Sequence, residues 1–70
     1  METIIKKRLA EKGITIHAFH KRIGGNRTLA YQIAKGFYRA TQPQREKIAD
    51  ALETPVDVLF DENGMPKIAE

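Results

Sequence analysis

The chain has 70 residues, 41% of them hydrophobic and 30% charged, with a net charge of +3 and neither cysteine nor serine. This composition describes one small domain, near the lower size limit at which a single hydrophobic core is sufficient. It excludes disulfides, cysteine-based zinc sites and the two commonest catalytic nucleophiles, so we expect no enzyme, no cofactor and no metal site. No apolar run exceeds three residues and the N-terminal segment lacks a signal-peptide pattern, so we expect a cytoplasmic protein without a membrane partner.

Two short helices are predicted in the first third of the chain. The first covers residues 2–12, with good helix formers throughout and Gly13 as its C-terminal stop. Thr15 is a candidate N-cap for the second helix, in which Phe19 and Ile23 lie one turn apart on the same face. That face is expected to be buried.

A glycine pair separates the second helix from the third. Gly24 and Gly25 predict a tight turn, because glycine adopts positive φ at little steric cost. Asn26 is a candidate N-cap for a third helix over residues 27–35, which Gly36 ends. One face of this helix is apolar, with Leu29, Ala30, Ile33 and Ala34. The opposite face carries Arg27, Thr28, Tyr31, Gln32 and Lys35.

Two more helices are predicted before the chain ends. Thr41, with Gln44 three residues later, has the pattern of a capping box at the start of a fourth helix. Thr54 and Pro55 predict the cap and the first position of a short fifth helix that runs through Phe60. No segment shows the alternation of a strand. We therefore predict an all-α bundle of about five short helices over residues 1–60 and a C-terminal tail over 61–70.

Charge is divided unevenly along this bundle. Residues 12–45 contain seven basic side chains and no acidic one, whereas residues 46–70 contain two basic and seven acidic ones. Such an asymmetry favours a polyanion-binding face in the first part. The alternative is a solvated helical surface that happens to be basic.

The glycine turn and the polar third helix together predict a helix-turn-helix. A major groove about 12 Å wide admits one α-helix, and side chains at positions i, i+1, i+4 and i+5 then reach base edges. The candidate base-contacting residues with this spacing are Arg27, Thr28, Tyr31 and Gln32. Glutamine pairs with adenine and arginine with guanine, while threonine and the tyrosine ring meet a thymine methyl or a phosphate. The candidate phosphate-contacting residues are Lys21, Arg22, Asn26, Lys35, Tyr38 and Arg39. Phe37 is expected in the core.

From Ile14 to Phe60 the chain resembles the lambda-repressor-like helix-turn-helix domains of phage Cro and repressor proteins. The matching positions are Ile14, Thr15, Phe19, Ile23, Gly24, Asn26, Ile33, Gly36, residues 48–52 and residues 56–60. The resemblance implies a sequence-specific DNA-binding transcription regulator of the Cro or repressor type. It also implies that helix 27–35 enters the major groove of a palindromic operator, bound by a homodimer.

The chain departs from the family at several positions. Ile16 stands where members usually have a phosphate-binding glutamine, His20 where a small residue is usual, and Ala30 where a bulky aliphatic is usual. The last two exchanges are expected to offset each other in volume. His17 and His20 are three residues apart, which is compatible with a metal pair, but a structural role is favoured because no cysteine or nearby acid accompanies them.

Two alternatives stay open at the level of sequence. The first is a small helical protein-interaction module, or an antitoxin, whose acidic part, residues 46–70, binds a partner protein. The second concerns the apolar residues of the C-terminal third, which either mediate self-association or only complete the core. These residues are Val56, Val58, Leu59, Phe60, Met65 and Ile68.

Overall fold

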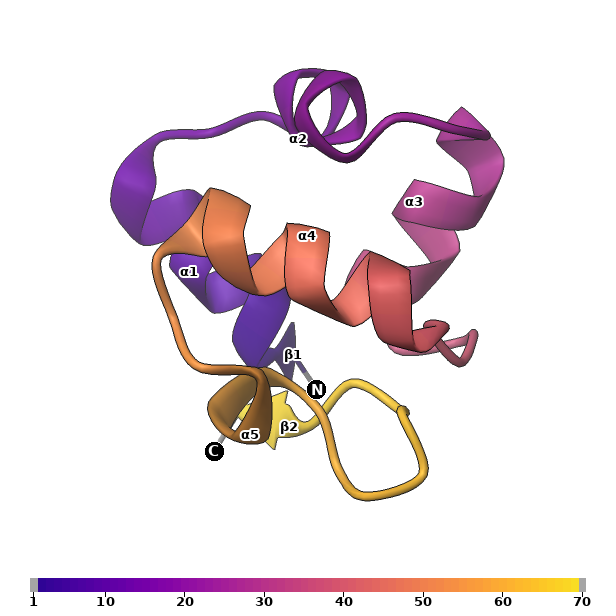
Figure 1. Ribbon diagram of the computed structural model, residues 1–70. Coiled ribbons are helices and arrows are strands. Elements are labelled where there is room, and N and C mark those ends of the chain that lie inside the picture. Colours follow the sequence, from indigo (N-terminus) through magenta and orange to yellow (C-terminus); the bar gives the residue numbers. More distant parts are fainter. Residues whose placement is uncertain (1, 70) are drawn as a thin grey trace.

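Five helices and one two-stranded sheet account for most of the chain in the computed structural model, which describes residues 2–69 (Figure 1). The elements are β1 (Glu2–Thr3), α1 (Ile4–Lys12), α2 (Ile16–Ile23), α3 (Arg27–Lys35), α4 (Gln42–Leu52), α5 (Val56–Leu59) and β2 (Ile68–Ala69). The predicted helical bundle is confirmed over these residues, and Met1 and Glu70 lie outside them. None of the described helices is both long and apolar enough to cross a bilayer.

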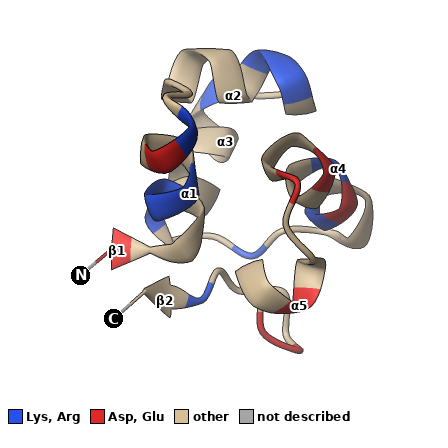
Figure 2. Ribbon diagram, turned by 90° about the vertical axis from the view of Figure 1, so that its left-hand side faces the viewer, with Lys and Arg blue, Asp and Glu red and all other residues tan. Residues whose placement is uncertain are grey.

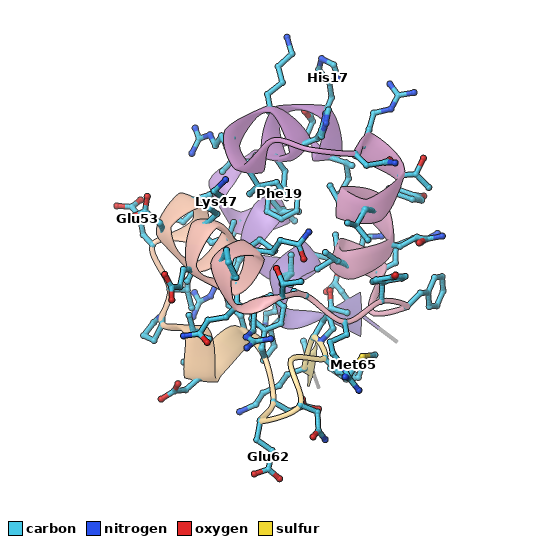
Figure 3. The ribbon with its side chains drawn as sticks, turned by 45° about the vertical axis from the view of Figure 1, so that its right-hand side comes forward. His17, Phe19, Lys47, Glu53, Glu62 and Met65 are labelled. Atoms are coloured by element: carbon cyan, nitrogen blue, oxygen red, sulfur yellow. The ribbon has the colours of Figure 1, made fainter. Side chains whose placement is uncertain are left out.

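The helices enclose a core to which every helix contributes. In Figure 1, α2 lies at the top, α3 descends on the right, α4 crosses the centre, and α5 and the sheet lie below. The largest fully buried side chains include Ile5 of α1, Phe19 of α2, Ile33 of α3, Ile48 of α4 and Leu59 of α5. Phe19 points from α2 into the space between the other helices (Figure 3).

The predicted caps of the central helices are confirmed. The Thr15 hydroxyl accepts a hydrogen bond from the Ala18 amide at 3.1 Å. At the start of α4, the Gln44 amide donates to the Thr41 hydroxyl at 3.4 Å and the Thr41 amide donates to Gln44 Oε1 at 2.8 Å. Each cap satisfies amides that the first helical turn leaves unpaired.

The N-terminus corrects the prediction of a purely helical chain. Residues Glu2 and Thr3 form a strand that pairs antiparallel with Ile68 and Ala69, and α1 begins only at Ile4. Thr3 is the cap of α1, and its buried hydroxyl donates to the Ala34 carbonyl near the end of α3. Two-residue strands are too short for an alternating pattern, so their pairing left no sequence signal.

The segment predicted as a tail folds back over its described part, residues 61–69. Asp61 Oδ1 accepts hydrogen bonds from the amides of Asn63 and Met65. Gly64 is buried, and its carbonyl accepts a hydrogen bond from the Ala40 amide at 3.0 Å. This turn brings β2 back to β1 and closes the lower end of the core.

The start of α5 differs from the prediction. The Thr54 hydroxyl does not cap the helix but donates to the Leu52 carbonyl at 2.9 Å, at the end of α4. Pro55 takes the cap position without a side-chain hydrogen bond, and the helix ends at Leu59. A threonine hydroxyl can either accept a bond from an amide at the start of a helix or donate to a carbonyl at the end of one. Here it donates to the unpaired carbonyl at the end of α4, which is nearer.

Candidate nucleic-acid interface

A three-residue turn joins α2 to α3, as the glycine pair predicted. Gly24 and Gly25 have φ angles of 75° and 77°, in the left-handed region that favours glycine. Asn26 Oδ1 then accepts the amides of Thr28 and Leu29 at 2.8 and 3.4 Å, which starts α3. The turn therefore fixes how α3 leaves α2.

His20 holds this turn from the last turn of α2. Its Nε2 lies 2.6 Å from the Gly25 carbonyl oxygen, so Nε2–H donates to that carbonyl. Its Nδ1 is buried without a hydrogen-bond partner in the described part of the chain. The structural role expected for His20 follows from this bond. Among residues 2–69, no group of three or more histidine, cysteine or acidic side chains is arranged to hold a metal ion.

The predicted exchange of volume between His20 and Ala30 stays a prediction. A hollow of about 170 Å³ lies between the turn, the inner face of α3 and the start of α4, and Ala30 is among its lining residues. His20 is not among the lining residues, although Gly25, whose carbonyl its ring contacts, is one of them. Ala30 itself is 2% exposed, so its neighbours cover almost all of it.

The outer face of α3, defined as Arg27, Thr28, Tyr31, Gln32 and Lys35, points away from the core. Ala30, Ile33 and Ala34 on the opposite face are at most 2% exposed. Arg27 and Thr28 are exposed and Tyr31 is 43% exposed, whereas Gln32 and Lys35 are half-buried. The helix therefore carries all four predicted base-contacting side chains on its outer face, and Gln32 is the least accessible of the four.

Aromatic rings flank the ammonium group of Lys35. Its Nζ lies 4.8 Å from the centroid of the Tyr31 ring and 5.9 Å from that of Phe37. Such contacts attract the cation to the electron-rich ring faces and restrict its position. Lys35 is thereby held near the C-terminal end of the outer face of α3.

The prediction that Phe37 lies in the core is wrong, since its side chain is 72% exposed. Gly36 ends α3 with a φ of 88° and turns the chain outward. A Cβ added at Gly36 would lie 2.9 Å from the Thr3 side chain, so the N-terminal strand occupies the space beside this turn. Phe37 consequently projects outside the core, next to Lys35.

The structure brings some of the predicted phosphate-contacting residues to this side of the molecule and separates others. Tyr38 and Arg39 are exposed in the connector that follows α3, and Lys21 is exposed on α2. The side-chain oxygen of Asn26 accepts the capping hydrogen bonds of α3. The Arg22 guanidinium instead lies 3.5 Å from the Ala51 carbonyl, at the end of α4. Arg22 thus faces α4 and not the outer face of α3.

A second hollow, of about 330 Å³, adjoins the outer face of α3. It is lined by Ile16 and His17 of α2 and by Arg27, Thr28 and Tyr31 of α3. His17 projects from α2 away from the body of the molecule (Figure 3). From the sequence, His17 was considered only together with His20, and the position of His17 beside α3 was not predicted. The available signal was its position directly after Ile16, in the first turn of the helix that precedes the glycine turn.

Acidic residues are concentrated in the C-terminal half of the fold, although α4 carries basic residues as well (Figure 2). Figure 2 shows the acidic residues of the C-terminal half on α4, on α5 and on the loop after it, while α2 carries only basic charges. Where the two regions meet, Lys12 Nζ lies 3.0 Å from Glu53 Oε1. The hydrogen bond from Lys12 and its positive charge lower the pKa of Glu53. Residues 12–45, which include α2 and α3, contain no acidic residue.

Comparison of the chain with protein-family models, with curated protein sequences and with solved structures gives no match.

Proposed function

We propose that the chain is a sequence-specific DNA-binding transcription regulator of the Cro or repressor type, a lambda-repressor-like helix-turn-helix domain whose α3 enters the major groove. The observation that carries the proposal is the outer face of α3. Arg27, Thr28 and Tyr31 are accessible there, directly after a glycine turn that separates two well-capped helices. A groove-reading helix needs such a row of accessible side chains.

The distribution of charge supports the same assignment. α2 and α3 contain basic side chains and no acidic one, so a phosphate backbone beside them meets no repulsive carboxylate on those two helices. Lys35, Tyr38 and Arg39 follow one another around the C-terminal end of α3. Contacts from these residues to phosphate would hold the helix in register without specifying sequence.

A dimer on a palindromic operator is part of the proposal. One helix reads only a few base pairs, so adequate specificity calls for two half-sites about 34 Å apart. Leu59 and Phe60 are core residues, at 0% and 2% exposure, and do not offer a contact surface. Val58 and Ile68 are 38% and 43% exposed and line one shallow hollow with Ile4. They are the apolar C-terminal residues that a second copy would cover.

The rival function is a protein-interaction module, and a specific observation favours it. Six exposed acidic residues lie on α4, at its end, on α5 and in the following loop, and they would suit a basic partner. Glu62 lies at the opposite end of the molecule from His17 (Figure 3). The two functions therefore use different faces and are separable by experiment.

Selection of bound duplexes from a random pool tests the proposed function. We expect the wild-type chain to enrich a palindromic motif. Thr28→Ala and Gln32→Ala should relax the motif at distinct positions and weaken binding to the wild-type motif about fivefold to 150-fold, because a good base contact contributes about 1–3 kcal/mol of discrimination. Sequencing of the enriched pools gives both the motif and the spacing of its half-sites.

Glu62→Gln is the matched control for these variants, since it changes an exposed side chain far from α3 and should leave the motif unchanged. A pool that yields no motif with the wild-type chain, despite weak salt-sensitive binding, would mean that the basic surface is nonspecific. The interaction module would then be the better account.

A further inference from the structure

The hollow between α2 and α3 has a lining that is more apolar than polar. Ile16 lines it on the α2 side, and Thr28 and Tyr31 line it on the α3 side. Arg27 and His17 complete the lining. Ile16 also packs against the core, which fixes its position, while the Tyr31 ring is held by the nearby ammonium of Lys35.

We propose that this hollow receives the 5-methyl group of a thymine in each operator half-site, so that Ile16 and Tyr31 select thymine at that position. The inference rests on the proposed function and makes it more specific. It adds Ile16, a residue of α2, to the base-reading residues of α3. It also assigns the Tyr31 ring to a methyl group and not to a phosphate.

The chemistry of base edges determines which group suits the hollow. In the major groove, guanine, adenine and cytosine are read through their hydrogen-bond donors and acceptors. Thymine is the only one of the four bases that also presents a methyl group there. Placing a polar edge against Ile16 and the Tyr31 ring would leave its donors or acceptors unpaired, which costs free energy. A methyl group gains from the same surroundings.

The surroundings of the hollow favour duplex DNA over a free apolar ligand. Arg27 belongs to the lining, Lys21 follows His17 by one turn of α2, and Lys35 follows Tyr31 by one turn of α3. No acidic residue occurs on either of these helices. A polyanion that carries methyl groups along its groove matches both the apolar walls and the basic surroundings.

Replacing each half-site thymine in turn by uracil tests the proposal, because uracil keeps every hydrogen-bonding group of thymine and lacks only the methyl. The selected motif supplies the duplexes, and fluorescence anisotropy gives the affinities. We expect one thymine per half-site at which uracil weakens binding about fourfold, the equivalent of about 0.8 kcal/mol for one buried methyl-sized group. Thymines elsewhere in the motif should tolerate the change.

The same measurement with variants assigns the effect to the hollow. Tyr31→Ala should bind more weakly and lose most of its sensitivity to uracil at that position. Ile16→Val, which keeps a branched side chain packed against the core, should reduce the sensitivity in part. Phe37→Ala is the matched control, since it removes another exposed aromatic ring outside the hollow and should keep the fourfold effect.

Three results would overturn the inference. A selected motif whose thymines all tolerate uracil, or a motif without thymine, leaves the proposed function standing and removes the methyl site. Uracil sensitivity that Tyr31→Ala retains in full places the methyl elsewhere. A pool that yields no motif overturns the proposed function and this inference together.

Discussion

Raising the salt concentration from about 50 to about 200 mM is expected to weaken binding of the chain to its selected duplex about a thousandfold. The expectation follows from about six phosphate contacts, each of which releases condensed counterions when it forms, giving a slope near −5 in a plot of log K against log salt. In the proposed dimer, Lys21, Lys35 and Arg39 of each copy would supply these six contacts. Anisotropy titrations at a series of salt concentrations measure the slope.

Single charge changes show where this dependence arises. Lys35→Gln should reduce the slope by about two, because it removes one phosphate contact from each copy of the dimer. Lys67→Gln is the matched control, as it removes the same charge from an exposed side chain whose Nζ is bonded to the Asp57 carbonyl, next to the acidic surface. A wild-type slope near zero, or no measurable affinity for duplex at physiological salt, would contradict the proposed function.

Replacing Gly64 by alanine is expected to lower the free energy of unfolding by about 3 kcal/mol. Gly64 has a φ of 85°, and an L-residue there costs about 1–2 kcal/mol. An added Cβ would also lie 2.9 Å from the Ala40 carbonyl oxygen and would collide with the Arg45 guanidinium, which donates to that same oxygen. Forced overpacking of this kind costs a further 1–3 kcal/mol or so. Urea unfolding followed by circular dichroism measures the loss.

Gly13→Ala is the matched control for this variant. Gly13 has a φ of 68°, but an added Cβ would meet no atom within 4 Å. Its loss should be limited to the backbone cost, about 1–2 kcal/mol. If both variants lost the same amount, the C-terminal segment would not be packed against the connector as the structure has it.

Local signals in the sequence were sufficient for the helices that position α3. Thr15, Gly24, Gly25 and Asn26 act over two to four residues, through caps and backbone conformations that each residue type favours on its own. The bounds of α3, Arg27–Lys35, agree with the prediction for the same reason. Such interactions need no knowledge of the rest of the fold.

Features that depend on distant partners could not be predicted in this way. Thr3 caps α1, pairs with Ile68 and bonds to Ala34, and two of these three partners lie more than thirty residues away. Phe37 is hydrophobic in sequence yet exposed, because Gly36 and the N-terminal strand together direct the chain outward. The place of His17 beside α3 likewise follows from the packing of two helices.

The surface that contacts DNA is the central claim, and an NMR titration of the labelled chain with the selected duplex tests it most directly. The account predicts that amide signals of α3, of the connector at residues 37–39 and of the first turn of α2 shift. Signals of the acidic surface, residues 46–62, should stay in place. Shifts confined to residues 46–62, or no shift with any duplex, would contradict the account.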